Sequence, residues 1–176
     1  MTGYILPYKG TLPTIAEDVF VAETAVITGD VVVGKGSSIW YGVVMRGDVH
    51  EIRIGEDTNI QDNSVVHVTR DKFGCYIGSR VTVGHGAILH ACRIEDDAFV
   101  GMGATVMDGA VVESGAMVAA GALVTPGKVV KKGELWSGSP AKFLRELTEK
   151  ELAFFPVSAE NYRLLGLEYL EENRKG

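Results

Sequence analysis

The chain has 176 residues, with 17 basic and 23 acidic side chains that give a formal net charge of −6 at pH 7. This length suits one domain with a substantial core. The net negative charge and the lack of a basic tract argue against a nucleic-acid partner. No apolar run approaches a membrane span and the first residues lack a targeting pattern, so we expect a soluble protein without a membrane partner.

An aliphatic residue recurs every six positions along most of the chain, and a small or β-branched residue usually follows it four places later. The recurring positions are Ile15, Val21, Ile27, Val33, Ile39, Met45, Ile54, Ile60, Val66, Ile77, Val83, Leu89, Ile94, Val100, Val106, Val112, Val118, Val124 and Val130. A period of six fits neither a helix nor a simple strand, but it fits a short strand followed by a tight turn. Three such units make a triangular coil, and stacked coils pair as parallel strands. We therefore predict a mainly β fold, a parallel β-helix over residues 1–138 with a short N-terminal strand segment. A sandwich or barrel of short strands has no reason to keep this register.

After Val130 the repeat ends, and the sequence predicts C-terminal α-helices over residues 139–176. The signals are a possible cap and first position at Ser139 and Pro140, a capping-box spacing at Thr148 and Glu151, and a second possible cap at Ser158 after Pro156. We expect these helices to pack along the prism or to cover its open edge, as part of the same single domain.

Two cysteines, Cys75 and Cys92, stand apart from any Cys-x-x-Cys pair. Disulfides belong mainly to oxidising compartments, so unpaired cysteines favour a cytoplasmic location. We interpret both side chains as small apolar residues of the core.

The six-residue register places two of the four histidines directly above one another. His67 follows Val66 and His90 follows Leu89, so each takes the second position of its unit. Their separation of 23 residues equals one coil of 18 plus five residues, which the segment 69–76 must loop out. Strands on adjacent coils lie about 4.8 Å apart. Two imidazoles at that separation can bind one cation, because Zn–N distances are about 2.0 to 2.1 Å.

Arg46 falls in the same column, one coil before His67. His85 lies on a different face of the predicted prism, one coil after Asp62, and a single prism cannot bring it to the stacked pair. A threefold assembly would pack that face beside the histidine column of a neighbouring chain. The register therefore predicts a homotrimer with a metal site between subunits. His50 lies in an extra segment between units, and we expect it in a loop.

Two segments, VVMRGDVHEIRIGEDTNIQDNSVVHV and VGHGAILHACRI, resemble the γ-class carbonic anhydrase branch of the hexapeptide-repeat family. The resemblance extends over nearly the whole chain. It implies a left-handed coil, although parallel crossovers are usually right-handed. In this family three histidines bind a catalytic divalent metal between the subunits of a homotrimer. The resemblance implies that His67 and His90 of one chain and His85 of the next bind Zn²⁺, or Fe²⁺ or Co²⁺.

The resemblance also implies an activity, the reversible hydration of carbon dioxide to bicarbonate by a metal-bound hydroxide. A zinc ion with three histidine ligands leaves a position for water and lowers the pKa of that water to about 7. Gln61 matches a glutamine that orients the hydroxide or the substrate. Arg46, Asp48 and Asp62 match a charged network across the interface, for which an ion pair without a catalytic role is an equal alternative. Tyr162 resembles a tyrosine near the metal in shorter relatives, or is a core residue of an amphipathic helix.

One position departs from the resemblance. Val49 stands where active members carry an acidic residue that relays a proton, and the acidic loop is shortened as well. Turnover requires the proton to leave, so the activity is expected to be low.

Two other classes of function remain open from the sequence. Many hexapeptide proteins are acyltransferases that use one histidine as a general base, but acyl transfer has no use for three converging histidines. A noncatalytic trimeric scaffold or a thioesterase acting on coenzyme A esters would keep the metal.

Overall fold

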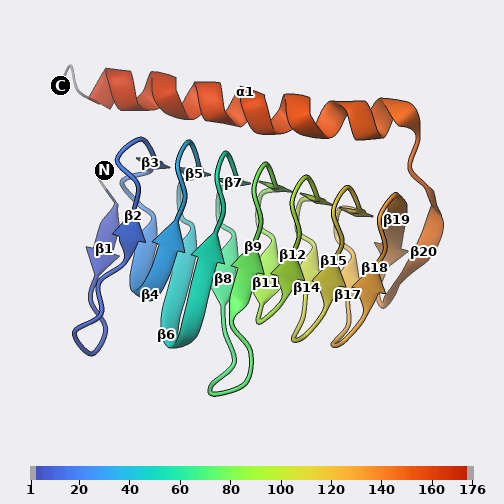
Figure 1. Cartoon of the computed structure of the whole chain (residues 1–176), viewed down its shortest axis with the longest axis horizontal. Coiled ribbons are helices and arrows are strands. Elements are labelled where there is room, and N and C mark those ends of the chain that lie inside the picture. The colour runs from blue at the N-terminus through green and yellow to red at the C-terminus, as the bar shows by residue number, and fades with distance from the viewer. Residues whose placement is uncertain (1–2, 174–176) are drawn as a thin grey trace.

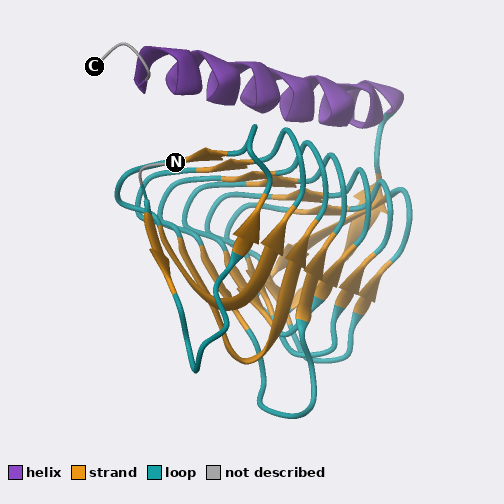
Figure 2. Cartoon of the chain, turned by 60° about the vertical axis from the view of Figure 1, so that its left-hand side comes forward, coloured by secondary structure: helices purple, strands orange, loops and turns teal. Residues whose placement is uncertain are grey.

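A computed structural model describes residues 3–173, whose short strands coil into a triangular prism with one long helix along one side (Figures 1 and 2). Each coil contributes one strand to each of three faces. The stacking is that of a parallel β-helix, as the six-residue period predicts, and its left hand is the one that the resemblance implies.

We name the three faces by what they carry. The histidine face, with His67 and His90, contains β1 (Tyr4–Leu6), the first halves of β4 (Val26–Val33) and β6 (Val44–Ile54), β8 (Val65–His67), β11 (Ile88–His90), β14 (Thr105–Val106) and β17 (Leu123–Val124). The middle face contains β2 (Thr14–Ile15), the second halves of β4 and β6, β9 (Cys75–Ile77), β12 (Arg93–Ile94), β15 (Val111–Val112) and β18 (Val129–Val130). The helix face contains β3 (Phe20–Val21), β5 (Ser38–Ile39), β7 (Asn59–Ile60), β10 (Thr82–Val83), β13 (Phe99–Val100), β16 (Met117–Val118), β19 (Glu134–Gly138) and β20 (Ala141–Glu146).

The aliphatic residues of the repeat fill the interior of the prism, as predicted. Ile27, Ile60 and Leu89 are fully buried, and alanines such as Ala25 and Ala87 close the corners behind them. Each large aliphatic side chain removed from water contributes about 1.5 to 3 kcal/mol. The repeated inward positions therefore supply most of the hydrophobic stabilisation and hold each coil in register with the next.

Strands β4 and β6 bend together around the corner between the histidine face and the middle face. Gly29 has a φ of +80°, and a Cβ there would lie 2.2 Å from the carbonyl oxygen of Gly47. Only glycine fits this close approach. The two strands pair on both sides of the bend, at Gly29 with Gly47 and at Val31 with Ile52. This pairing keeps β6 extended through His50, so the expectation of a loop there is wrong.

The extra residues between β8 and β9 loop out of the coil, as predicted. Thr69 and Phe73 face each other in an isolated antiparallel bridge at the base of this loop. Figures 1 and 2 show the loop projecting beyond the prism. The excursion leaves the next coil in register, with Ile54 paired to Ile77 on the middle face.

The region after the repeat differs from the predicted set of helices. Residues Ala141–Glu146 form strand β20 instead of a helix that starts at Ser139 and Pro140. The chain reverses after Gly138, which has a φ of +98°, and β20 pairs antiparallel with β19. One continuous helix, α1 (Glu149–Asn173), stands in place of the remaining predicted helices.

Helix α1 begins at the capping box predicted from the sequence. The N–H of Glu151 donates to Thr148 Oγ1 at 3.3 Å, and the N–H of Thr148 donates to the Glu151 carboxylate at 2.8 Å. Pro156 lies inside the helix and does not end it. Ser158 is not a cap, because its hydroxyl is buried against the hydroxyl of Thr82 in β10, at 3.1 Å. Packing on the prism holds the helix together across the proline.

Helix α1 lies along the helix face and returns to the end of the prism where the chain begins (Figure 1). Its buried residues are Phe155, Ser158, Ala159 and Gly166. Near its C-terminal end, Tyr169 contacts Phe20 with ring centroids 5.1 Å apart, and Tyr162 meets Trp40 edge to face at 5.5 Å. The C-terminal region therefore packs along the prism.

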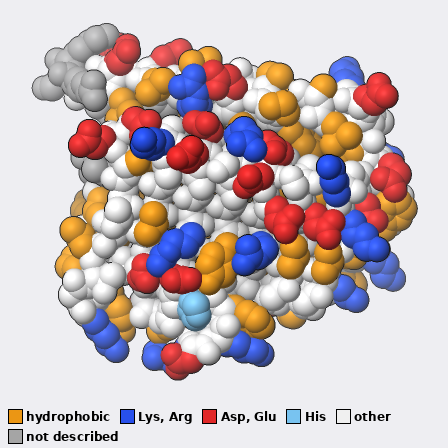
Figure 3. Space-filling view, viewed as in Figure 1, with side chains coloured by type: hydrophobic (Ala, Val, Ile, Leu, Met, Phe, Trp, Pro, Cys, Tyr) orange, Lys and Arg blue, Asp and Glu red, His pale blue; other side chains and the backbone are white. Residues whose placement is uncertain are grey.

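The outer surface mixes charges of both signs. On the face seen in Figure 3, Lys and Arg side chains alternate with Asp and Glu side chains. Interspersed charges cancel locally, so this face does not build the positive potential that a polyanion would require. Within residues 3–173, no helix has the length and apolar character required to cross a bilayer.

The corner glycine makes a testable prediction about stability. Gly29→Ala is expected to lower the free energy of unfolding by about 3 kcal/mol, because the left-handed backbone costs about 1 to 2 kcal/mol and the clash adds a similar amount. The matched control is Gly121→Ala, which shares a positive φ of 68° but would bring its Cβ within 4 Å of nothing. It should lose only the backbone part. Urea unfolding at equal protein concentration measures both, and equal losses would contradict the close approach.

Candidate metal centre

The stacked histidine pair predicted from the register is present. His67 of β8 and His90 of β11 are direct partners across the parallel ladder. His67 Nδ1 and His90 Nε2 lie 3.2 Å apart. Two nitrogens bound to one tetrahedral cation at about 2.0 to 2.1 Å lie about 3.3 Å from each other. The spacing of the pair therefore fits a shared ion.

Aspartates bind the outer nitrogen of each ring. His90 Nδ1 lies 2.7 Å from Asp108 Oδ1, and His67 Nε2 lies 3.1 Å from Asp48 Oδ1. An ionised carboxylate only accepts hydrogen bonds, so each of these ring nitrogens carries the proton. The two nitrogens that face each other then both carry lone pairs. Two lone pairs at this distance repel unless a proton or a metal cation lies between them, and carboxylates orient metal-binding imidazoles in this arrangement.

Hydrogen bonds keep both carboxylates ionised. Burial alone would raise the pKa of Asp108, but hydrogen bonds from Thr69 and His90 lower it below its ordinary value. Burial opposes ionisation of Asp48 in the same way, and hydrogen bonds from Arg46 and His67 lower its pKa. The charge on each aspartate therefore persists at neutral pH and fixes the proton on the outer ring nitrogen.

Burial raises the pKa of a carboxyl group but lowers the pKa of an imidazole. It lowers the pKa of His67, although the hydrogen bond to Asp48 acts in the other direction. A neutral imidazole keeps the lone pair that a metal requires. His67 is therefore suited to act as a ligand at physiological pH.

His85 lies apart from the stacked pair, at the edge of the helix face. Its Nδ1 lies 2.8 Å from Asp62 Oδ2, which leaves Nε2 as the nitrogen with the lone pair. Among residues 3–173, no three His, Cys, Asp or Glu side chains gather closely enough to hold a metal ion. One chain thus offers a pair of imidazoles at one place and a single oriented imidazole at another, as the register predicts.

Gln61 and Tyr162 lie on the helix face, on the same side of the prism as His85. Gln61 is 4% exposed and its Nε2–H donates to Asn59 Oδ1 at 2.9 Å, so the side chain points along its own strand. Tyr162 is partly buried against Trp40. Burial and the nearby charge of Asp62 raise the pKa of Tyr162. Tyr162 thus packs against Trp40 as a core residue would, and the charge of Asp62 also acts on its hydroxyl.

Asp108 is a site residue that sequence reasoning missed. It lies 18 residues after His90, which is one coil along the prism. The same count that stacks the histidines would have found it. The aspartate holds the imidazole from one side and accepts a hydrogen bond from the Thr69 hydroxyl of the projecting loop on the other.

Exposed aliphatic side chains border the histidine column. Val44, Val65 and Ile88 are 36%, 37% and 43% exposed, and each lies two residues before Arg46, His67 or His90 on its strand. We call these three residues the aliphatic stripe. Side chains two apart on a strand share one side, so the stripe and the histidines present a single outward surface.

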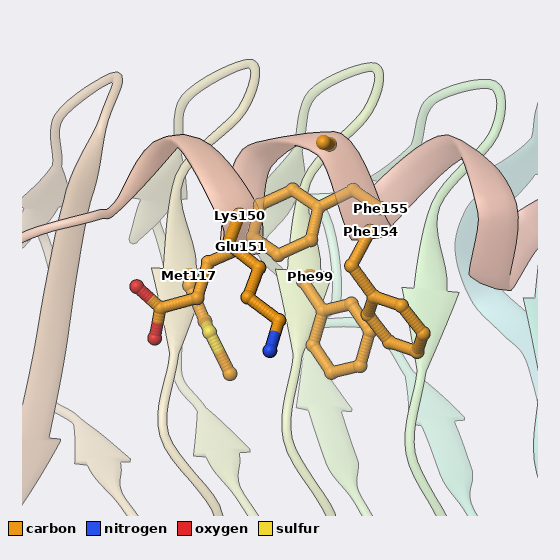
Figure 4. A pocket seen from close by; sticks show the side chains of 7 residues that line it. Phe99, Met117, Lys150, Glu151, Phe154 and Phe155 are labelled. Atoms are coloured by element: carbon orange, nitrogen blue, oxygen red, sulfur yellow. The ribbon is translucent and has the colours of Figure 1, made fainter.

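An apolar pocket of about 440 Å³ lies elsewhere, between the start of α1 and strands β13 and β16 (Figure 4). Phe99, Met117, Phe154 and Phe155 line it, with Lys150 and Glu151 beside them. Glu151 is already held by Arg145 and by the capping box. This pocket lies on the helix face and has no connection with the histidine pair.

The chain has clear relatives. A family model for the bacterial transferase hexapeptide (six repeats) matches residues 91–126. The chain is 53% identical over 168 residues to gamma carbonic anhydrase 2, mitochondrial, of Arabidopsis thaliana. The match covers 93% of this chain and 60% of that protein. It is 51% identical over 148 residues to a probable carbonic anhydrase of Methanocaldococcus jannaschii, with 84% of this chain and 92% of the relative covered.

Among solved structures, a putative acetyltransferase of Bacillus cereus matches with a TM-score of 0.93. The sequence identity is 41%, and the match covers 96% of this chain and 98% of that one. The plant relative is longer, since the chain spans only 60% of its length.

The carboxylate behind His90 makes a prediction about metal affinity. For a cation held by this column, Asp108→Asn is expected to weaken binding by about 10- to 100-fold, since the uncharged amide no longer fixes the imidazole proton. Asp71→Asn on the exposed loop is the matched control and should bind like the original chain. Competition with a chromogenic chelator measures both, and unchanged affinity for Asp108→Asn would argue against an orienting role.

Proposed function

We propose that this chain, which belongs to the γ-class carbonic anhydrase branch of the hexapeptide-repeat family, hydrates carbon dioxide reversibly at a divalent metal shared between neighbouring chains of a homotrimer. One observation carries the proposal. The aspartates behind His67 and His90 leave two lone pairs facing each other at 3.2 Å. A shared cation removes this repulsion.

In this proposal, His67 and His90 of one chain and His85 of the next hold the cation. Three imidazoles suit Zn²⁺, and they suit Fe²⁺ or Co²⁺ as well. A divalent cation with such ligands acidifies a bound water molecule, so that hydroxide is available near neutral pH. Carbon dioxide is small and uncharged, so the reaction needs an oriented approach rather than a large pocket.

The remaining polar residues orient the site in this proposal. Asp48 and Asp62 each hold one histidine, and Arg46 holds Asp48 through an ion pair. Gln61 donates through its amide nitrogen to Asn59, so its amide oxygen is the atom that would accept a hydrogen bond at the site. The Tyr162 hydroxyl lies on the side of Asp62 and would border the site across the subunit boundary.

We also propose that the protein is cytoplasmic. Cys75 and Cys92 are buried free thiols with sulfur atoms 3.9 Å apart. A reducing compartment keeps such a pair as thiols.

A trimer needs a surface to form on, and the aliphatic stripe suits that role. Ile88→Glu is expected to convert the trimer to monomer, because it buries a charge at an apolar interface. It should also lower the metal content, because each site then loses its third histidine. Val129→Glu on the middle face, where Val129 is 39% exposed, is the matched control. Sedimentation velocity with metal analysis measures both effects, and a trimeric, metal-loaded Ile88→Glu protein would contradict this interface.

The enzymatic proposal is tested by carbon dioxide hydration in stopped flow, on protein whose metal content has been measured. We expect activity that disappears when a chelator removes the metal and returns when Zn²⁺, Fe²⁺ or Co²⁺ is added. His90→Ala should reduce the rate to the uncatalysed background, because one chain then offers a single ligand to the site. Equal rates for metal-free and metal-loaded protein would refute the proposal.

Acyl transfer is the second candidate, favoured by one observation. His85 is partly exposed and is oriented by Asp62, as a general base would be. A transferase of this kind, or a thioesterase acting on coenzyme A esters, would leave the facing pair of His67 and His90 unexplained. Consumption of acetyl-CoA by the metal-free protein, abolished by His85→Ala, would favour this candidate over hydration.

A further inference from the structure

Hydration of carbon dioxide releases one proton for every bicarbonate, because CO₂ and H₂O give HCO₃⁻ and H⁺. That proton must reach the buffer before the next turnover. Histidine is the side chain that most readily gains and loses a proton between pH 5 and 8. Three of the four histidines of the chain are proposed ligands. His50 is the imidazole that the proposed metal site does not use.

Strand β6 places His50 two residues after Asp48, which contacts His67. Asp48 and His50 lie on either side of Val49, and Val49 packs against the hydrophobic core. Residues two apart on a strand point to the same side. Asp48 and His50 therefore both face outward, and the valine cannot carry a proton.

One cavity joins the two outward residues. It has a volume of about 400 Å³, and Asp48, His50 and Glu51 line one side, while Tyr8 and Thr11 of the N-terminal segment line the other. This space suffices for on the order of ten water molecules at about 30 Å³ each. Asp48 also contacts His67 at 3.1 Å. One carboxylate thus borders both the histidine pair and the cavity.

A backbone hydrogen bond holds the His50 ring, because its Nδ1 accepts the N–H of Glu51 at 2.9 Å. The ring packs closely against Gly74, where a Cβ would lie 3.0 Å from this nitrogen. The charged and titratable groups that face the ring and its cavity are Lys9, Asp30, Asp48, Glu51, Tyr8 and Tyr76, with Arg53 holding Asp30 and Glu51.

A proton taken up at Nδ1 removes the lone pair that accepts the Glu51 N–H. That hydrogen bond then breaks, and the ring can turn towards the cavity mouth. There the imidazolium gives its proton to a buffer base and returns to the neutral form. The cycle consumes nothing, because the proton accepted from cavity water is the proton released to buffer.

We infer that His50 carries the proton of the hydration reaction from the water beside Asp48 to the buffer. This inference rests on the proposed function. It also accounts for how a chain with Val49 packed against the core can complete turnover.

Exchange of ¹⁸O between carbon dioxide, bicarbonate and water at chemical equilibrium tests this role, since mass spectrometry separates two rates. One is the interconversion of carbon dioxide and bicarbonate, which needs no proton from outside the site. The other is the release of labelled water, which does. His50→Gln is expected to lower the second rate about 10- to 100-fold and to leave the first unchanged. Imidazole added to the buffer should restore the second rate.

Thr11→Ala, on the opposite wall of the cavity, is the matched control and should change neither rate. If both rates of His50→Gln fall together, or if neither changes, the relay is refuted. Absence of both rates in the metal-loaded original chain would refute the proposed function, and the relay with it. NMR of the imidazole nitrogens gives a readout without turnover, where we expect the neutral His50 ring to carry its proton on Nε2 and to accept the Glu51 N–H at Nδ1. A neutral ring with its proton on Nδ1 would overturn the inference.

Discussion

The spacing between stacked strands is the constraint on which this structure depends. A coil of eighteen residues brings equivalent positions to neighbouring strands, about 4.8 Å apart. Side chains that are far apart in the sequence then form columns on the outside of the prism. His67 and His90 are Cα partners across one such step. A hydrophobic register that is required for folding therefore also sets the distance between two potential ligands.

Departures from the regular coil occur where the candidate site needs extra groups. The loop between β8 and β9 carries Thr69, whose hydroxyl bonds to Asp108 behind His90. The bend of β4 and β6 at Gly29 brings Asp48 against His67. The regular coils hold the imidazoles, while the bend supplies the Asp48 carboxylate and the loop supplies the hydroxyl that bonds to the Asp108 carboxylate. The interior stays unchanged, since the inward aliphatic positions from Val21 to Val130 are buried.

Sequence rules for helix ends succeeded where the interacting residues lie within a few positions of each other. The capping box of Thr148 and Glu151 formed as its spacing indicates. The same rules failed at Ser139 and Pro140, where a cap-like pair lies in the turn before β20, because pairing of β20 with β19 outweighed the local helix signal. They failed again at Ser158, which bonds to Thr82 from within α1. In both cases a contact with another element decided the outcome.

The sequence by itself determined the prism, its register and the stacking of His67 on His90, because a six-residue period of buried aliphatic side chains puts three short strands in each coil of eighteen residues. Only the tertiary structure decided which nitrogen of each ring is engaged, since that depends on Asp48 and Asp108 approaching from the neighbouring coils. It also decided that His50 belongs to a strand and shares a cavity with Asp48. Carboxylate orientation and cavity shape arise from packing between coils, and a periodic pattern carries no information about them.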